Sequence, residues 1–319
     1  MRRVKYCLIS LASRRKEWNS VMAKQPRSLY GKVAVVTGGG RGIGKALALA
    51  LASEGCRVAI GDVDAASAET AAAGLGGEAF GLPLDVTDRQ GFTGFLDEVE
   101  RRLGPIDVLV NNAGIMPVGP LDQEDDATAI RVLEINLHAV IHGTKEAMRR
   151  MKPRGTGHIV NVASSAGKSS FPNLATYCAT KHGVVGLSEA VRAELRGSGV
   201  QVSVVMPGIV KTELSTGLVE TPAFKSSTPE EVAAAVVDAL KFARFDVFVP
   251  KSIGRVWALF NIVPRRVREA VGRAIGLDRA LLNADRAARA TYEARAAASA
   301  PGTDAVIAES AAERESAAA

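Results

Sequence analysis

Tyr177 and Lys181, four residues apart, are the clearest candidates for chemistry in this sequence, and Ser164 lies thirteen residues before the tyrosine. Helix positions i and i+4 lie on one face, so the lysine ammonium can sit beside the phenol and favour its ionised form. Tyrosine titrates near pH ~10, so a base acting near neutrality needs its pKa lowered by roughly three units, or about 4 kcal/mol. We expect a nearby cationic ring and a dry cleft to supply what one lysine cannot, while the Ser164 hydroxyl holds a substrate oxygen. The same spacing also occurs on solvated helix faces, so its interpretation depends on the segments that precede it.

A glycine-rich segment, Thr37–Gly44, has the spacing G-x-x-x-G-x-G and lies between an apolar run and a helical pattern. Glycines allow a tight turn and a close approach of the backbone to a pyrophosphate, and the helix N-terminus supplies free N–H groups. A flexible turn is the alternative for such a loop alone, but the strand–loop–helix context favours a dinucleotide site. Cofactor contacts are predicted from Gly38, Arg41, Gly42, Ile43 and Gly44.

Two charged residues bear on the type of dinucleotide. Asp62, eighteen residues beyond Gly44, can accept hydrogen bonds from both ribose hydroxyls and would repel a 2′-phosphate. Arg41 has the opposite effect, because a basic residue in the glycine loop could pair with that phosphate. We expect the repulsion to decide, and we predict NAD rather than NADP. Further cofactor contacts, near the adenine and along the cleft, are predicted from Asp85, Val86, Asn112, Ala113 and Gly114.

These residues need a framework that brings loops and helix ends to one edge of a sheet. Short continuous apolar runs, typical of strands buried on both faces, alternate with helical patterns from Lys32 onward. The alternation predicts the α/β class, with a doubly wound Rossmann-type parallel sheet of about seven strands and helices on both faces. Strands are expected at Val33–Thr37, Arg57–Gly61, Ala79–Leu84, Ile106–Val110, His158–Ala163, Val200–Met206 and Asp246–Pro250. Helices are expected at 42–54, 65–74, 88–103, 122–151, 174–197 and 229–243.

Charge and composition divide the chain into four parts. Residues 1–30 carry a net charge of +7 and are predicted to be a basic leader, with Met22 as an alternative start. Residues 31–250, with a net charge of −4, are predicted to form the NAD-binding Rossmann catalytic domain, and their acidic balance argues against nucleic-acid binding. Residues 251–298 are predicted to be a basic amphipathic helical extension, and residues 299–319 a disordered tail rich in Ala, Ser and Glu.

The cysteines and histidines show no spacing typical of metal ligands. Three scattered cysteines favour reduced thiols and a cytoplasmic location, and the four histidines are expected to be structural. No metal site is therefore predicted. The sequence also lacks a run of about 18 or more apolar residues, so no transmembrane helix is expected.

Taken together, these motifs resemble the short-chain dehydrogenase/reductase family in its short single-domain form, over about residues 31–250, with a C-terminal extension. The resemblance rests on the TGGGRGIG loop, the Asn111–Gly114 segment, the serine, tyrosine and lysine, and Pro207-Gly208 after the sixth strand. It implies that Tyr177 is the general acid/base and that Ser164 orients and polarises the substrate oxygen. It further implies that Lys181 binds the nicotinamide ribose and lowers the pKa of the tyrosine.

The resemblance also assigns a helix asparagine and the loop after the sixth strand. Asn136 would hold a water of a proton relay, rather than being only a polar residue at a helix kink. Thr212 would contact the nicotinamide carboxamide. The residues expected to line the nicotinamide are Pro207, Gly208, Val210 and Thr212.

The implied reaction is hydride exchange between the nicotinamide and an alcohol or carbonyl compound, while Tyr177 moves the proton. We therefore predict an NAD-dependent oxidoreductase that acts on a hydrophobic primary or secondary alcohol or its carbonyl form. An NADPH-dependent 3-ketoacyl reductase is the alternative that Arg41 favours. A non-catalytic nucleotide-sensing scaffold on the same fold is the alternative from another class.

Apolar residues after Thr212 occupy the place of the family's substrate lid. They predict a lipophilic substrate such as a steroid, a retinoid or a fatty derivative, although lids of this family are usually apolar whatever they bind. The apolar residues concerned are Leu214, Leu218, Val219, Pro222 and Phe224 in the lid, with Ile115, Met116, Phe171 and Leu174 beside it.

The C-terminal extension allows two interpretations. Aromatic and aliphatic residues at 256–263, followed by Arg265, Arg266, Arg268 and Arg273, favour peripheral membrane contact through residues 255–273. The alternative is a helical arm packed on the core or on a second subunit, with its arginines solvated. The family resemblance suggests a homodimer or homotetramer formed through the helices at 122–151 and 174–197.

Overall fold

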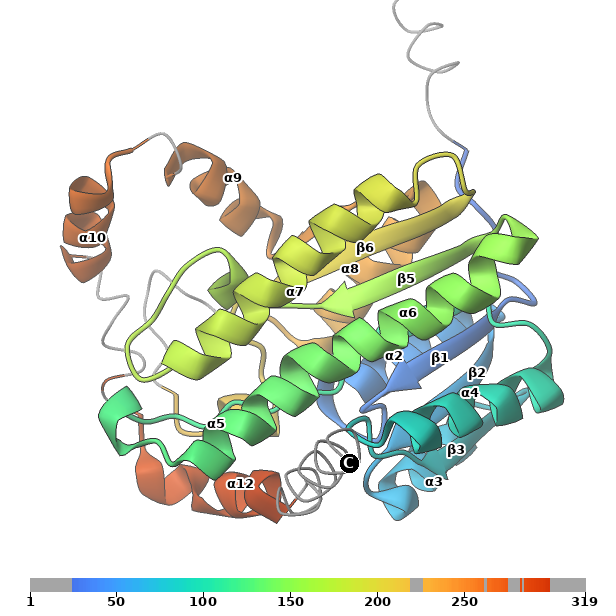
Figure 1. Ribbon diagram of the computed structural model, residues 1–319, viewed down its shortest axis with the longest axis horizontal. Helices are drawn as coiled ribbons and strands as arrows, with labels where there is room; N and C mark the ends of the chain where they lie inside the picture. The colour runs from blue at the N-terminus through green and yellow to red at the C-terminus, as the bar shows by residue number, and fades with distance from the viewer. Residues whose placement is uncertain (1–24, 219–225, 261–262, 275–281, 283, 299–319) are drawn as a thin grey trace, which may run out of the picture.

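The computed structural model describes residues 25–218, 226–260, 263–274, 282 and 284–298. Seven parallel strands form one sheet in the order β3-β2-β1-β4-β5-β6-β7, with helices on both faces (Figure 1), so the predicted fold class is confirmed. The strands are β1 (Val33–Thr37), β2 (Arg57–Asp62), β3 (Ala79–Pro83), β4 (Val108–Asn111), β5 (Gly157–Val162), β6 (Val200–Pro207) and β7 (Asp246–Val249).

The order of the strands reverses between β1 and β4, which lie side by side with Val36 opposite Val110. Connections from these two strands leave in opposite directions, so a crevice opens at their carboxyl ends. β4 begins at Val108, two residues later than predicted. The Asp107 side chain there accepts a hydrogen bond from the N–H of Val33 (3.1 Å) and fixes the start of both strands.

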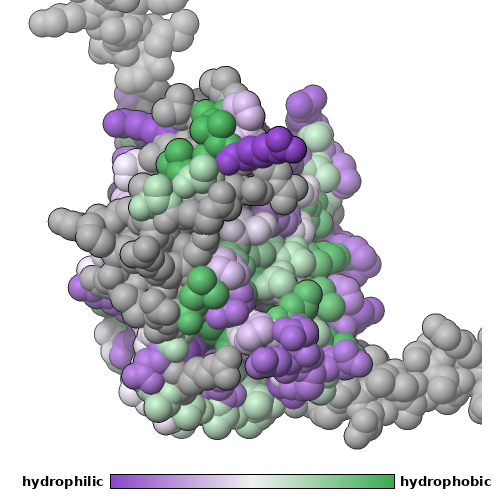
Figure 2. All heavy atoms as spheres, turned by 90° about the vertical axis from the view of Figure 1, so that its left-hand side faces the viewer, coloured by the Kyte–Doolittle hydropathy of each residue, from purple (hydrophilic) through white to green (hydrophobic). Residues whose placement is uncertain are grey.

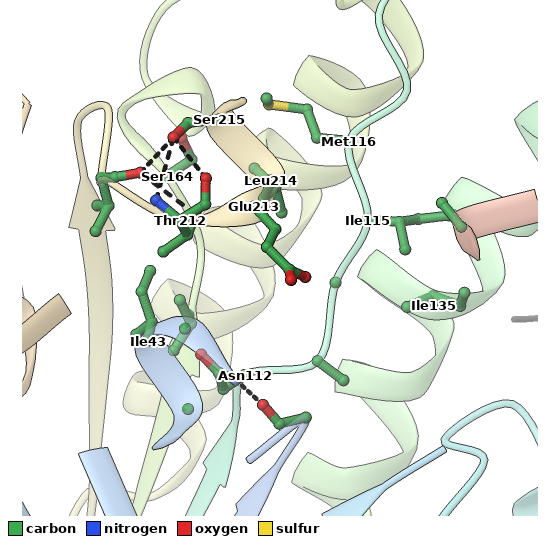
Figure 3. A pocket seen from close by; sticks show the side chains of 18 of the residues that line it. Ile43, Asn112, Ile115, Met116, Ile135, Ser164, Thr212, Glu213, Leu214 and Ser215 are labelled. Carbon is green, nitrogen blue, oxygen red and sulfur yellow. Dashed lines mark hydrogen bonds between the residues drawn. The ribbon is translucent and has the colours of Figure 1, made fainter. Parts of the chain in front are cut away.

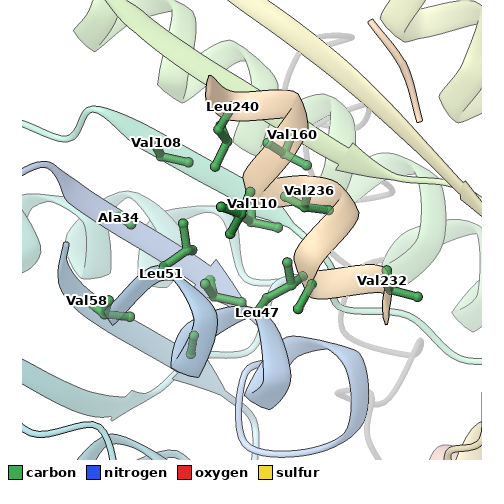
Figure 4. Packing of buried hydrophobic residues seen from close by; sticks show 14 of the residues in the cluster. Ala34, Leu47, Leu51, Val58, Val108, Val110, Val160, Val232, Val236 and Leu240 are labelled. Carbon is green, nitrogen blue, oxygen red and sulfur yellow. The ribbon is translucent and has the colours of Figure 1, made fainter. Parts of the chain in front are cut away.

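One face of the sheet is covered by α2 (Gly42–Ser53), α3 (Ala65–Ala73) and α8 (Pro229–Phe242). Figure 4 shows Leu47 and Leu51 of α2 and Val236 and Leu240 of α8 in one cluster with strand residues such as Val110 and Val160. α8 begins at a capping box, in which Glu231 N–H donates to Thr228 Oγ1 (3.3 Å) and Thr228 N–H donates to Glu231 Oε2 (3.0 Å). Burying each large aliphatic side chain stabilises the fold by about 1.5–3 kcal/mol.

The opposite face is covered by α4 (Arg89–Leu103), α6 (Ala139–Met151) and α7 (Ala175–Glu194). The single helix predicted at 122–151 is divided instead. A short 3-10 turn at Leu121–Gln123 precedes α5 (Asp126–Leu133), and a π-helical turn at Glu134–His138 joins α5 to α6. The extra residue of a π turn shifts the helix face locally, and such turns are frequent at functional sites.

The C-terminal extension is helical, as predicted. It contains α9 (Lys251–Phe260), α10 (Arg265–Ala274) and α12 (Arg286–Ala298), and Figure 1 shows α9 and α10 standing apart from α12. Val267 and Val271 of α10 are 48% and 40% exposed, and the described residues on this side mix hydrophobic with hydrophilic side chains (Figure 2). Among the described residues, no helix has both the length and the apolar character needed to cross a membrane.

Several predicted features lie outside the described residues. They are most of the basic leader with Met22, the tail at 299–319, the lid residues Val219, Pro222 and Phe224, and the side chains of Arg265, Arg268 and Arg273.

Candidate active site

A cleft of about 550 Å³ opens at the carboxyl ends of the strands, at the β1/β4 reversal. Of all the residues predicted to bind the cofactor or take part in catalysis, only Asn136 does not line it. Figure 3 shows Thr212–Ser215 beside Ser164 on one side, and Ile115 and Ile135 on the other. The walls come from the glycine loop, the ends of β2, β4, β5 and β6, the start of α7, the lid and α12.

Glycine is required at two positions of the loop between β1 and α2. Gly38 has φ +62°, and a Cβ there would lie 2.8 Å from the Cα of Ala113. A Cβ on Gly44 would lie 2.1 Å from the carbonyl oxygen of Gly38. Asn112 fastens the loop, because its Nδ2 donates to the carbonyls of Thr37 (2.9 Å) and Gly38 (3.0 Å). The loop is thus held tightly against the segment after β4.

The N-terminus of α2 fits a pyrophosphate. Arg41 occupies the N-cap position, and its side chain makes no capping hydrogen bond. The first N–H groups of the helix receive no cap from the Arg41 side chain and lie beside the cleft, which Gly42, Ile43 and Gly44 line. The donor set and the narrow glycine turn match a dinucleotide, as the sequence predicts.

Three carboxylates and two guanidinium groups gather at the end of β2. Asp62 accepts hydrogen bonds from the N–H groups of Gly40 (2.9 Å) and Asp64 (3.1 Å). Arg41 does not stand free for a phosphate, since it donates to Asp64 and to Ser67 Oγ (2.8 Å). Glu213 and Arg295 complete the group. Glu213 Oε2 lies 2.7 Å from Arg295 Nη2 and 4.0 Å from Arg41 Nη1.

Tyr177, Ser164 and Lys181 meet where α7 begins above the end of β5. The Ser164 side chain lies close enough to the Tyr177 phenol to lower its pKa, and Ser164 Oγ accepts a hydrogen bond from the N–H of Ala166 (3.1 Å). The Lys181 ammonium donates to the carbonyl of Val162 (3.0 Å) and lies 5.6 Å from the centre of the tyrosine ring. Tyr177 is 8% and Lys181 4% exposed, so both reach the cleft from a buried helix face rather than a solvated one.

The pKa values of this pair are dominated by burial. Burial raises the pKa of Tyr177 well above 10, and the Ser164 side chain lowers it only in part. Burial also lowers the pKa of Lys181 to about 8. The expectation that a dry cleft helps to ionise the phenol is therefore wrong in sign, because desolvation penalises the charged phenolate. Positive charge close to the phenol has to lower the pKa of Tyr177.

Asn136 lies in the π-helical turn and is fully buried. Its Nδ2 donates to the carbonyl of Ile115 and its Oδ1 accepts from the N–H of the same residue, both at 2.8 Å. A Cβ on Gly114 would lie 3.1 Å from Asn136 Oδ1 and 3.6 Å from Lys181 Nζ. The asparagine side chain thus fixes the backbone after β4 next to the lysine.

The remaining predicted cofactor residues lie along the same cleft. Asp85 Oδ1 accepts hydrogen bonds from the N–H (2.9 Å) and hydroxyl (2.7 Å) of Thr87. Thr212 caps the short turn Glu213–Ser215, and a Cβ on Gly42 would lie 3.3 Å from its Cγ2. The others lining the cleft are Val86, Asn112, Ala113, Gly114, Pro207, Gly208 and Val210.

Apolar side chains line the part of the cleft beyond Tyr177. Among the described lid residues, Leu214 and Leu218 pack against a small cluster that includes Met116, Leu174 and Tyr177. Ile115 and Phe171 line the same space. Within the described residues, no group of three or more His, Cys, Asp or Glu side chains could hold a metal ion.

Sequence reasoning missed Asp64, Glu213 and four residues of α12 that line the cleft, Tyr292, Arg295, Ala296 and Ala298. Asp64 had a detectable signal, since it precedes an alanine-rich helix and accepts a hydrogen bond from the N–H of Ser67 (3.1 Å) as its N-cap. The α12 residues recur at intervals of three and four, which indicates one packed helix face but not its partner.

Comparison with known proteins agrees with this geometry. A family model described as short chain dehydrogenase matches residues 32–223. The chain is 35% identical over 217 residues to the 3-oxoacyl-[acyl-carrier-protein] reductase FabG of Haemophilus influenzae, covering 65% of this chain and 90% of that protein. It is 38% identical over 222 residues to the D-threitol dehydrogenase of Mycolicibacterium smegmatis, covering 66% and 85%. A crystal structure of a short chain dehydrogenase/reductase from Burkholderia phymatum in complex with NAD matches with a TM-score of 0.68 and 27% identity, covering 73% of this chain and 94% of that one.

Proposed function

Because the chain belongs to the short-chain dehydrogenase/reductase family of oxidoreductases, we propose that it interconverts a hydrophobic alcohol and its carbonyl compound with NAD(H). The observation that carries the proposal is the meeting of Ser164, Tyr177 and Lys181 in the cleft that the glycine loop also lines. Family membership makes the chain an enzyme and argues against the non-catalytic scaffold.

In this proposal Tyr177 exchanges the proton of the substrate oxygen. A nicotinamide cofactor held along the glycine loop would supply the acceptor or donor of the hydride for the substrate carbon. During oxidation the Tyr177 phenolate takes the hydroxyl proton, and during reduction the phenol returns it to the oxygen. Ser164 holds that oxygen by a hydrogen bond, and Lys181 contributes a positive charge that favours the phenolate.

The charges at the end of β2 support NAD over NADP. Asp62 lines the cleft, and Arg41 is already bound by Asp64 and Ser67. A 2′-phosphate carries about two negative charges, so it would meet an uncompensated carboxylate and would have to displace Asp64 from the arginine. The ribose hydroxyls of NAD carry no charge and can donate to Asp62.

The lining of the far end of the cleft supports a hydrophobic substrate. Met116, Phe171, Leu174, Leu214 and Leu218 are all apolar and lie together around Tyr177. Apolar lining favours transfer of alkyl or ring groups out of water at about 25 cal/mol per Å². A small polyol such as the D-threitol of the Mycolicibacterium smegmatis relative would leave its hydroxyl groups without partners there.

The test is a matrix of substrates and coenzymes, followed by the absorbance of the reduced nicotinamide. We expect turnover of cyclohexanol and 2-octanol with NAD⁺ to exceed that of D-threitol by at least about tenfold in kcat/KM, or about 1.4 kcal/mol. Preference for D-threitol would contradict the hydrophobic substrate, and preference for NADP⁺ would contradict the coenzyme.

A second candidate is an NADPH-dependent 3-ketoacyl reductase. It is favoured by the match to the reductase of Haemophilus influenzae and by the presence of Arg41 in the glycine loop. Acetoacetyl-CoA with NADPH or NADH belongs in the same matrix. Faster reduction of this thioester with NADPH than any alcohol turnover with NAD⁺ would select the second candidate.

A further inference from the structure

The last described helix, α12, lies near α5 in Figure 1, and its residues Tyr292, Arg295, Ala296 and Ala298 line the cleft. Arg289, Tyr292 and Ala296 recur along it at intervals of three and four, so they share one helix face. Arg289 is 0% and Ala296 5% exposed, and Tyr292 and Ala296 line the cleft. Arg289, which is not among the four arginines named in the sequence prediction, is therefore buried rather than solvated.

The guanidinium group of Arg289 binds two separate loops. Its Nη1 donates to the carbonyls of Leu214 (3.1 Å) and Thr216 (2.8 Å), which belong to the lid. Its Nη2 donates to the carbonyl of Met116 (2.7 Å), in the segment after β4. Leu214 and Met116 line the cleft from these two loops. One side chain thus ties together two walls of the substrate site.

Tyr292 adds a second link to the segment after β4. Its hydroxyl accepts a hydrogen bond from the N–H of Met116 (2.8 Å). The guanidinium carbon of Arg289 lies 5.2 Å from the centre of the Tyr292 ring, within the range of a cation–π contact. Met116 is therefore held through both its N–H and its carbonyl by neighbouring residues of α12.

The lid and the start of α12 are fitted closely to each other. The N–H of Asp285 donates to the carbonyl of Gly217 (2.9 Å), and the Asp285 side chain accepts from the N–H of Ala288 (3.1 Å). Gly217 has φ +75°, and a Cβ there would lie 2.7 Å from the carbonyl oxygen of Asp285. A close approach that only glycine allows indicates a defined contact rather than loose proximity.

The contacts of Arg289 are better suited to positioning the lid and the Met116 segment than to stabilising the fold as a whole. Burying an arginine is costly unless its donors are satisfied, and among the described residues Glu293 is the one carboxylate that pairs with Arg289 (3.0 Å). The fork of the guanidinium reaches several carbonyls at once, which a lysine ammonium cannot do in the same geometry. Both side chains of the neighbouring ion pair Arg295–Glu213 are exposed. Such ion pairs contribute only about 0–1 kcal/mol to the free energy of unfolding.

We propose that α12 is the outer wall of the substrate site and that Arg289 is the positioning residue that holds the lid and the Met116 segment in their substrate-binding arrangement. This inference rests on the proposed function only for its kinetic part, since the tie between the two loops is independent of turnover. The carbonyls bound by Arg289 belong to substrate-side residues, so the affinity for the coenzyme should change little when the tie is lost.

The experiment compares the parent chain with Arg289→Met, Arg289→Lys and Tyr292→Phe, and with Thr291→Ala as a control at an exposed position of the same helix. Amide hydrogen exchange is followed in three peptides, at residues 114–118, 213–218 and 33–37. NADH affinity is measured by fluorescence, and KM and kcat are measured with 2-octanol and NAD⁺.

In Arg289→Met we expect amide exchange at 114–118 and 213–218 to rise at least about tenfold, with 33–37 unchanged. KM should rise at least about tenfold, while the dissociation constant of NADH stays within about twofold. Arg289→Lys should be intermediate, Tyr292→Phe should affect mainly 114–118, and Thr291→Ala should match the parent.

Two outcomes would overturn the inference. One is unchanged exchange and KM in Arg289→Met, and the other is a uniform rise in exchange that includes 33–37, which would make Arg289 a residue of general stability. Absence of turnover in the parent chain would contradict the proposed function alone, because the exchange measurement still decides the role of Arg289.

Discussion

Replacing Asp62 by asparagine should move the coenzyme preference towards NADP(H). In the structure Asp62 lines the cleft and its two oxygens accept from the N–H groups of Gly40 (2.9 Å) and Asp64 (3.1 Å). Asparagine keeps the shape and one acceptor oxygen but removes the charge. Because the NH₂ group of asparagine cannot accept the second of these hydrogen bonds, continued use of NAD⁺ by the variant is the control for the fold of the loop.

The expected size follows from Coulomb's law. Two unit charges about 4 Å apart repel by about 1 kcal/mol in water and about 4 kcal/mol at an effective dielectric constant near 20. Asp62 is partly exposed, so we take the value in water, about 1 kcal/mol, for its repulsion by each phosphate charge. A 2′-phosphate carries about two negative charges, so the repulsion amounts to about 2 kcal/mol. A gain of about 2 kcal/mol for NADP(H) corresponds to about a thirtyfold rise in the ratio of kcat/KM values.

The assay is the ratio of kcat/KM with NADP⁺ to that with NAD⁺, measured with one alcohol for the parent and each variant. Asp85→Asn is the matched control, because this carboxylate lines the same cleft but is bound by Thr87 after β3. We expect its ratio to stay within about twofold. An unchanged ratio in a folded Asp62→Asn variant that still uses NAD⁺ would refute the assignment of Asp62 to the ribose.

Three further predictions concern the lysine, the glycine loop and the core. Burial lowers the pKa of Lys181 from 10.5 to about 8. Between these pH values the lysine is protonated in the unfolded chain but mostly neutral in the folded one. The free energy of unfolding should therefore rise with pH from about 8 to 10.5. This rise, at most about 3 kcal/mol, should be absent in Lys181→Met when urea unfolding is compared from pH 7.5 to 10; parallel curves for both proteins would contradict it. Gly44→Ala, whose Cβ would lie 2.1 Å from the Gly38 carbonyl oxygen, should weaken NADH binding at least about a hundredfold by fluorescence titration, and unchanged binding would exclude the loop as the coenzyme site. Leu47→Ala, at a fully buried position of α2, should lower the free energy of unfolding by about 2–5 kcal/mol, and a loss below about 1 kcal/mol would show that the core does not depend on this contact.

The sheet and the nucleotide end could be predicted because their signals are local. Each strand contains several apolar residues, and Thr37–Gly44 carries both the turn and the start of α2 in adjacent residues. The tyrosine and lysine also share one helix turn. Such patterns need no knowledge of distant partners, which explains why their order along the chain was sufficient to place them in one cleft.

The role of α12 could not be predicted for the opposite reason. Arg289 binds Met116 across 173 positions of sequence, and an arginine in an alanine-rich helix has the same pattern whether it is solvated or buried. The π-helical turn that contains Asn136 also lacks a local signal, because its i→i+5 hydrogen bonds form with ordinary helix-forming residues. Long-range packing, rather than propensity, determines both features.

Burial changes the pKa of Tyr177 in the direction opposite to the one expected from the sequence. The sequence predicted a helix face with a neighbouring ammonium, and the structure has both, yet full burial raises the pKa of the phenol. A buried base needs positive charge at close range to compensate for its desolvation. Lys181 and the positive charge that a bound oxidised nicotinamide would supply must therefore lower the pKa of the tyrosine together.

The most direct test of this account is single-turnover hydride transfer in Tyr177→Phe, with cyclohexanol and NAD⁺, alongside NADH binding. The variant keeps the ring that packs with Met116 and Leu174 and removes only the hydroxyl that exchanges the proton. The account predicts a rate at least about a hundredfold lower, with the dissociation constant of NADH within about threefold of the parent value. Hydride transfer within tenfold of the parent rate would contradict the assignment of Tyr177 as the acid/base.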